Sequence, residues 1–232
     1  MKTIGLIGGM SWESSLEYYR ILNETVKERL GGLHSAKCIM YSVEFAEIEM
    51  LQHAGRWDEA AQKMVEAGQS LERAGADFLV LCTNTMHKLA PELEAGVGIP
   101  LLHIADATAG AIKAAGISSV GLLGTRFTME QAFYRQRLEE KHGLQVFIPD
   151  DADRELVHNV IYGELCLGVV KPESRRGFVA IFDKLVASGA QGIILGCTEI
   201  ESLIRQEDTT TPVFPTTRIH ATAAVEMALQ DA

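Results

Sequence analysis

The chain of 232 residues carries an internal repeat, and this feature constrains its fold more than any other. The segment IGLIGG at 4–9 matches VGLLGT at 120–125 with an offset of 116 residues, and Tyr18 maps to Tyr134 at the same offset. Further along, AGADFLVLCTNT at 74–85 matches SGAQGIILGCTEI at 188–200 with an offset of 115. Separate segments that share one offset to within a residue predict a tandem duplication of a unit of roughly a hundred residues, a usual domain size.

Short apolar runs alternate with amphipathic stretches along the chain. We expect strands at 4–8, 38–45, 78–82, 99–104 and 120–124, and helices at 12–30, 57–74, 84–93 and 106–115. Continuous apolar strands that alternate with helices are typical of a parallel sheet covered on both faces. We therefore predict an α/β fold of two similar lobes, the first formed by residues 1–98 with 210–232 and the second by 99–209.

Composition excludes several classes of protein. The formal net charge is −10 and the sequence has no block of Lys or Arg, which disfavours a nucleic-acid partner. No apolar run approaches the ~20 residues that a membrane span needs. The N-terminal segment lacks a signal-peptide cleavage site, so we expect a cytoplasmic protein with reduced thiols. The acidic stretch PDDADRE at 149–155 reads as a solvated linker.

Four cysteines are present, at positions 38, 82, 166 and 197. They form no Cys-x-x-Cys pair and no Cys/His cluster, so a structural zinc site has no support. Cys38 and Cys166 have no counterpart in the other copy, and we expect both to be core thiols. Cys82 and Cys197, by contrast, match each other in the repeat, and Thr follows each of them. A single such cysteine would most often be a packed core thiol.

The context of the matched cysteines favours chemistry. Each is predicted at the carboxyl end of a parallel strand, the edge where ligands bind in open α/β sheets. A helix N-terminus there would lower the pKa of the thiol from ~8.5 toward neutrality. If the two copies face one cleft around a pseudo-two-fold axis, their sulfurs approach one carbon from opposite sides. That arrangement suits inversion of a stereocentre, in which one group removes a proton and the other delivers one.

Several segments closely resemble the aspartate/glutamate racemase family, which consists of cofactor-independent amino-acid racemases. They are IGLIGGMSWESS at the N-terminus, LCTNTMH at 81–87, LLGTRFTME at 122–130 and LGCTEI at 195–200, and the resemblance spans essentially the whole chain. It implies two α/β lobes with the active site between them, Cys82 and Cys197 as proton donor and acceptor, no pyridoxal phosphate and no metal. It also implies a homodimer. The residues implied to hold the substrate backbone are Met10, Thr83, Asn84, Thr85, Thr125, Thr198 and Glu199.

One departure from the family pattern concerns the substrate. Acid-specific relatives carry an Arg in the segment that here reads EIEMLQHAG, and Met50 occupies the aligned position. Methionine cannot replace a bidentate Arg–carboxylate contact. Lys171 is a candidate for the missing charge, and Gln52 is a candidate to hydrogen-bond a polar side chain. The substrate is therefore Asp or Glu, or a broader set of amino acids.

Alternative functions remain open at this point. A decarboxylase or a cis–trans isomerase of the same superfamily is one, although the decarboxylase pattern replaces one cysteine and this chain has both. A two-lobed metabolite-binding protein without chemistry is another. For Glu199, a helix-dipole role and a contact to the substrate ammonium are equally supported. GLIGG lacks the full spacing of a dinucleotide fingerprint, and His87 is left outside the catalytic set.

Overall fold

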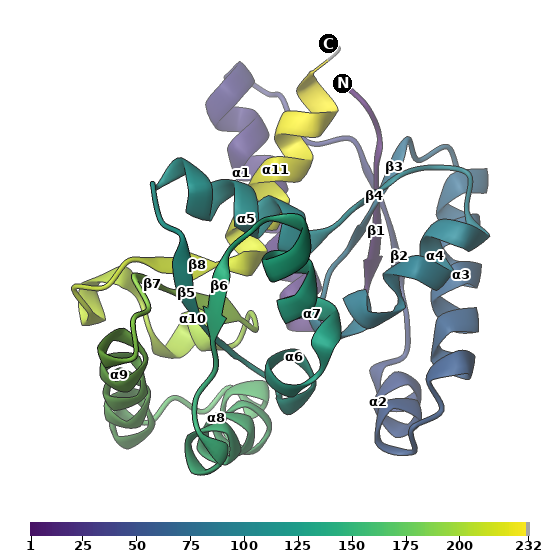
Figure 1. Ribbon diagram of the computed structural model, residues 1–232. Helices are drawn as coiled ribbons and strands as arrows, with labels where there is room; N and C mark the ends of the chain where they lie inside the picture. The colour runs from purple at the N-terminus through teal and green to yellow at the C-terminus, as the bar shows by residue number, and fades with distance from the viewer. Residues whose placement is uncertain (231–232) are drawn as a thin grey trace. The chain divides into compact units, whose positions relative to one another are not determined.

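The computed structural model describes residues 1–230, which form two compact units (Figure 1). Unit 1 contains Met1–Ile104 and the chain from His220 onward, and unit 2 contains Ala105–Ile219. The chain passes into unit 2 at the start of α5 (Ile104–Ala114) and returns to unit 1 within α11 (Thr216–Leu229). The sequence predicts that the chain passes between the lobes at 98/99 and 209/210. In the structure it does so at 104/105 and 219/220.

Each unit has a four-stranded parallel sheet, and the two sheets have the same strand order. The order is β2-β1-β3-β4 in unit 1 and β6-β5-β7-β8 in unit 2. The elements before α5 are β1 (Ile4–Gly8), α1 (Trp12–Leu30), β2 (Cys38–Ser42), α2 (Phe45–His53), α3 (Trp57–Arg73), β3 (Phe78–Leu81), the 3-10 turn η1 (Thr85–Leu89), α4 (Ala90–Gly96) and β4 (Leu101–Leu102). The parallel sheets and their helices confirm the predicted α/β class. The strand order that the two sheets share supports the internal repeat.

The elements between α5 and α11 repeat the scheme with shorter helices after the first strand. They are β5 (Ser119–Gly124), α6 (Arg126–Glu130), α7 (Ala132–Gln136), the π-turn η2 (Arg137–Lys141), β6 (Gln145–Phe147), α8 (Asp151–Gly163), η3 (Leu165–Leu167), α9 (Pro172–Ala187), β7 (Gly192–Gly196), α10 (Ile200–Leu203), η4 (Gln206–Asp208) and β8 (Val213–Pro215). Cys166 therefore lies in a 3-10 turn, where it packs against the core of unit 2.

Helices cover both faces of the sheet in unit 1 (Figure 1). Alternate strand residues point to opposite faces. Ile4 and Val80 pack with α1 and α11, whereas Ile7 and Leu79 pack with α3. Because both faces are buried, β1 and β3 are apolar throughout, as the continuous apolar runs predict.

Several predicted element ends are wrong, and local chemistry explains each difference. The strand predicted at 99–104 is only two residues long, because Pro100 cannot donate to a ladder and α5 begins at Ile104. The helix predicted at 84–93 divides into η1 and α4, with Pro91 in the first turn of α4. The acidic stretch at 149–155 is no linker: Asp150 is the N-cap of α8 and accepts a hydrogen bond from the Asp153 N–H at 2.9 Å.

The glycine-rich turn after β1 serves close packing of the backbone. Gly9 has a φ of 91°, and a Cβ at this position would lie 2.3 Å from the Val43 carbonyl oxygen. Only glycine fits both the left-handed conformation and this approach. The GLIGG segment is therefore explained without a dinucleotide.

Candidate active site

Both predicted catalytic cysteines lie where the sequence places them, directly after an inner strand of a parallel sheet. Cys82 follows the last residue of β3, and Cys197 follows the last residue of β7. Both thiols are free. Each sits at the carboxyl edge of its own sheet, the edge that binds ligands in open α/β folds.

The strand pairing relates the two units by an offset that differs from the offset of the sequence match. Ile7 of β1 pairs with Leu81, and its equivalent Leu123 of β5 pairs with Leu195, so β3 and β7 align at an offset of 114 residues. Strand β7 has one further residue, Gly196, before its cysteine. The prediction that the two cysteines occupy equivalent places is therefore wrong by one residue.

This extra residue turns the two side chains to different faces of their sheets. Cys82 continues the alternation of Val80 and packs in the cluster formed with α1 and α11. Cys197 continues the alternation of Leu195 and packs against the cluster that contains α8 and α9. The two thiols therefore have different surroundings.

The Cys82 thiol is fully buried. Its Sγ lies 3.8 Å from the carbonyl oxygen of Val80, to which the S–H donates. Burial, with a smaller effect from Cys38, raises the pKa of Cys82 well above the ordinary range of a thiol. A buried apolar site disfavours the charged thiolate, so this thiol is protonated in the free protein.

The Cys197 thiol is half-buried and has a carboxylate partner. Its Sγ donates to Oε2 of Glu199 at 2.8 Å. Burial and then the negative charge of Glu199 raise the pKa of Cys197 well above its usual range. This contact differs from both predicted roles of Glu199, since the carboxylate bonds the neighbouring thiol.

The predicted lowering of the thiol pKa values is thus wrong for the free protein. The segment after Cys82 is a five-residue 3-10 turn, and α10 after Cys197 has only four residues. Such short segments supply little macrodipole, and burial outweighs it.

The three polar residues after Cys82 form a turn that hydrogen bonds of His87 stabilise. Asn84 and Thr85 are buried, and Thr83 is half-buried. His87 Nδ1 bonds the Thr83 carbonyl at 2.7 Å, and the Ile104 N–H donates to His87 Nε2 at 3.2 Å. His87 therefore has a local structural role, consistent with its place outside the catalytic set.

Two of the predicted substrate contacts in unit 1 turn toward the core. Met10 is buried in the cluster that contains α3. The Gln52 amide Nε2 donates to Met86 Sδ at 2.9 Å, and Gln52 is buried. Met50, at the position aligned with the family's Arg, is exposed.

In unit 2 the predicted threonines have threonine partners. Thr198 Oγ1 lies 2.9 Å from Thr217 Oγ1, so the turn after Cys197 joins the first turn of α11. Thr125 caps α6, and its Oγ1 accepts from the Thr128 N–H at 3.3 Å. Thr217 is not among the residues predicted from the sequence; its place two residues after β8, at the carboxyl edge of its sheet, is a signal that could have found it.

The positive charge of Lys171 is already paired with a carboxylate of the protein. Its Nζ pairs with Glu164 Oε1 at 3.1 Å, within unit 2. An exposed pair of this kind contributes little to stability, but it does reduce the charge that Lys171 can offer to a substrate carboxylate.

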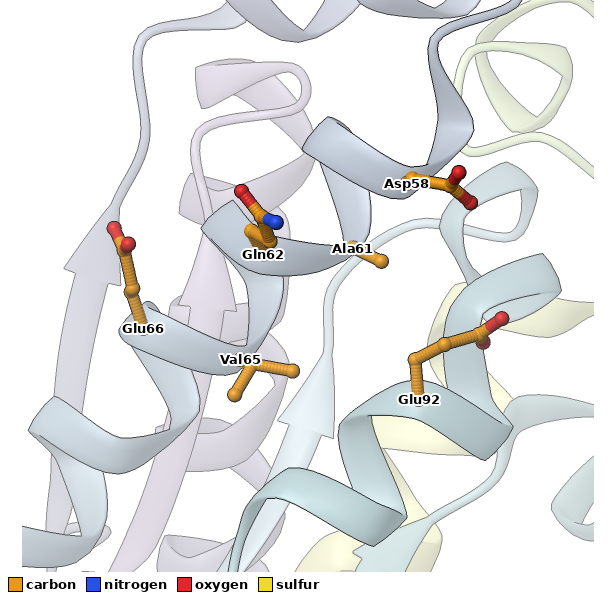
Figure 2. A pocket seen from close by; sticks show the side chains of 6 residues that line it. All are labelled: Asp58, Ala61, Gln62, Val65, Glu66 and Glu92. Carbon is orange, nitrogen blue, oxygen red and sulfur yellow. The ribbon is translucent and has the colours of Figure 1, made fainter.

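A pocket of about 410 Å³ lies elsewhere on unit 1, between α3 and α4 (Figure 2). Its lining residues are Asp58, Ala61, Gln62, Val65, Glu66 and Glu92. Three of its lining residues are acidic, it contains neither thiol, and none of the predicted site residues lines it. Figure 2 shows the carboxylates of Asp58 and Glu92 on facing segments.

Within residues 1–230, no group of three or more His, Cys, Asp or Glu side chains is arranged to hold a metal ion. No helix in this part of the chain combines the length and hydropathy that crossing a membrane requires.

The family assignment follows from comparison with known proteins. A family model described as Asp/Glu/Hydantoin racemase matches residues 7–224, nearly the whole chain. This chain belongs to the Asp/Glu/hydantoin racemase family. The protein is accordingly a racemase, an enzyme of the isomerase class.

Individual relatives agree with this family. A crystal structure of a candidate Asp/Glu racemase from Yersinia pestis is 60% identical, with a TM-score of 0.94 over 99% of this racemase and 100% of that chain. An aspartate racemase homologue from Pyrococcus horikoshii OT3 is 35% identical, with a TM-score of 0.87 over 98% and 99%. The broad specificity amino-acid racemase RacX of Bacillus subtilis (strain 168) is 24% identical over 72% of each chain.

Proposed function

We propose that this protein racemises amino acids without a cofactor and that Cys82 and Cys197 are its two acid–base groups. One observation carries the proposal: in each unit a free cysteine followed by threonine comes directly after an inner parallel strand, at the edge where such sheets bind ligands. Membership of a racemase family supports it. A homodimeric, cytoplasmic enzyme stays a prediction from the sequence and the resemblance.

The proposed reaction removes a proton from one face of the α-carbon and adds a proton to the opposite face. The Cys82 thiolate removes the α-proton and becomes a thiol, and the electron pair of the broken C–H bond stays on the substrate. The Cys197 thiol delivers its proton to the opposite face and becomes a thiolate. The reverse direction exchanges these roles, so no co-reactant is consumed. Hydroxyl and backbone N–H groups of the two Cys-Thr turns and of Thr125 would stabilise the developing negative charge.

Substrate binding has to assist formation of the thiolate. Burial raises the pKa of both thiols in the free protein. An amino acid carries an α-ammonium group, and a positive charge within ~4–6 Å of a sulfur favours the thiolate. Because Cys82 is fully buried, binding also has to uncover its sulfur.

We propose a broad set of amino acids as substrates. Met50 is apolar, the Gln52 amide is bonded to Met86, and Lys171 is paired with Glu164. None of these side chains matches the bidentate clamp that an Arg gives a side-chain carboxylate. The Bacillus subtilis relative is itself described as a broad specificity racemase.

The test is exchange of the α-proton and loss of optical activity, measured in deuterated water across acidic, neutral and basic amino acids. Cys82→Ala and Cys197→Ala should each lower racemisation at least about 100-fold, because each removes one proton carrier. Cys38→Ala is the matched control and should retain activity. Racemisation that persists in either single variant would refute the two-thiol mechanism.

The same assay separates the alternatives. A decarboxylase would release carbon dioxide, and a binding protein would retain ligand without exchange of the α-proton. Turnover restricted to Asp and Glu would leave the mechanism intact and refute the broad substrate range.

A further inference from the structure

The Cys197 thiol has a carboxylate as its hydrogen-bond partner, whereas the Cys82 thiol has a neutral carbonyl group. Glu199, two residues after Cys197, accepts a hydrogen bond from the Cys197 thiol at 2.8 Å. The residue two places after Cys82 is Asn84, whose amide carries no charge, and the Cys82 thiol faces the Val80 carbonyl instead. The two copies of the repeat are therefore chemically unequal at their thiols.

This carboxylate affects the two protonation states of Cys197 in opposite directions. It accepts a hydrogen bond from the neutral thiol, which stabilises that form. A thiolate at the same place would put two negative charges in contact, in surroundings that partly exclude water. Among the described residues, the titratable groups that act on the pKa of Cys197 are Glu199 from its own turn and Cys166 from η3, and both raise it.

We propose, on the basis of the racemase function above, that Glu199 is a positioning residue that keeps the proton on Cys197. The resting protein then presents Cys197 as the proton donor, and Cys82 is the group that ionises to accept the α-proton. After one such turnover, Cys197 is a thiolate beside Glu199 and Cys82 is a thiol. Cys197 then takes up a proton from water, which restores the resting form with both thiols protonated. The next substrate again causes Cys82 to release its proton to water, so the protons balance over one cycle.

The test is the pH dependence of alkylation of Cys197 in the free protein. Iodoacetamide reacts with the thiolate, and mass spectrometry of the Cys197 peptide reads this site apart from the other three cysteines. In the unaltered protein the midpoint should lie above that of an ordinary thiol, about 8.5. Midpoints are compared relative to the plateau rate at high pH, so a change in access to the sulfur does not alter them.

Glu199→Gln should lower this midpoint by at least one pH unit. Below both midpoints, Cys197 would then react about tenfold faster relative to its plateau. Glu199→Asn, which copies Asn84 of the other half, should act in the same direction. Glu207→Gln removes an exposed carboxylate elsewhere in unit 2 and should leave the midpoint unchanged.

Two results would overturn the proposal. An unchanged or higher midpoint in Glu199→Gln would mean that the carboxylate does not hold the proton on Cys197. A midpoint at or below about 8.5 in the unaltered protein would refute it even if both variants fail to fold. The measurement needs no turnover, so its failure is distinguishable from a failure of the two-thiol mechanism, which the Cys82→Ala and Cys197→Ala variants test.

Discussion

At the residue scale, the protonation state of a buried histidine is assigned by its neighbours. His220 Nε2 lies 2.8 Å from the Leu102 carbonyl oxygen, which can only accept, so Nε2 carries the proton. Nδ1 then accepts from the Tyr18 hydroxyl at 2.8 Å. One donor and one acceptor satisfy the neutral ring, and a second proton would have no place. The ring of His87 lies edge-on, with its centroid 5.6 Å away.

This neutral histidine predicts a loss of stability in acid. Burial lowers the pKa of His220 to about 4, from 6.5 in the unfolded chain. Between these values the unfolded chain binds a proton that the folded protein does not, so the stability is fully present above pH 6.5 and falls as the pH falls to 4. The expected loss is about 3 kcal/mol of unfolding free energy.

Urea unfolding measured between pH 7 and pH 4 checks this expectation. His220→Gln cannot titrate, so the variant should be less stable at pH 7 and should lose less stability on acidification than the unaltered protein. Parallel pH profiles of the two proteins would contradict the assignment.

At the scale of elements, the sequence predicts those whose signals are local. The predicted bounds of β1 and α1 match the structure, because a continuous apolar run marks the strand and Ser11 caps the helix by accepting from the Ser14 N–H. The strand predicted at 38–45 ends at Ser42, because Glu44 caps a new helix. Such ends depend on which of two competing local signals the tertiary structure satisfies.

The candidate site could be predicted only in part, because some of its features depend on tertiary structure and not on local sequence signals. Both cysteines lie at strand ends, as the motif LCTNT and its partner LGCTEI predict. The extra residue Gly196 in β7 changes which face Cys197 points to, and only the pairing of β5 with β7 reveals it. The raised pKa values follow from how the core closes around each sulfur, which a linear motif does not encode.

The N-cap of α8 provides a prediction at this scale. Asp150→Ala removes the side-chain oxygen that accepts from the Asp153 N–H, which leaves one amide of the first turn without this partner. We expect a loss of about 1 kcal/mol in the free energy of unfolding, measured by urea denaturation. Asp150→Asn retains a good capping side chain and is the matched control. Equal losses in the two variants would show that charge rather than capping stabilises this helix.

At the scale of the whole molecule, the repeat extends to strand order but not to polar contacts. Tyr18 and Tyr134 match in the repeat, and both are fully buried. The Tyr18 hydroxyl donates to His220 at 2.8 Å, whereas the Tyr134 hydroxyl donates to Thr108 over 3.5 Å. Duplication thus accounts for the core positions of both units, and each unit satisfies its buried hydroxyl in its own way.

These matched tyrosines predict unequal effects of the same change. Tyr18→Phe leaves a buried histidine nitrogen without its donor, and we expect a loss of about 1–3 kcal/mol in unfolding free energy. Tyr134→Phe removes a long, weak hydrogen bond and should cost less than about 1 kcal/mol. Both substitutions retain the aromatic ring, so the comparison of the two variants isolates the loss of the hydroxyl group from a loss of packing. Urea unfolding measures the totals, and hydrogen exchange resolved by peptide assigns each loss to unit 1 or unit 2. Equal losses would mean that the polar contacts follow the repeat after all.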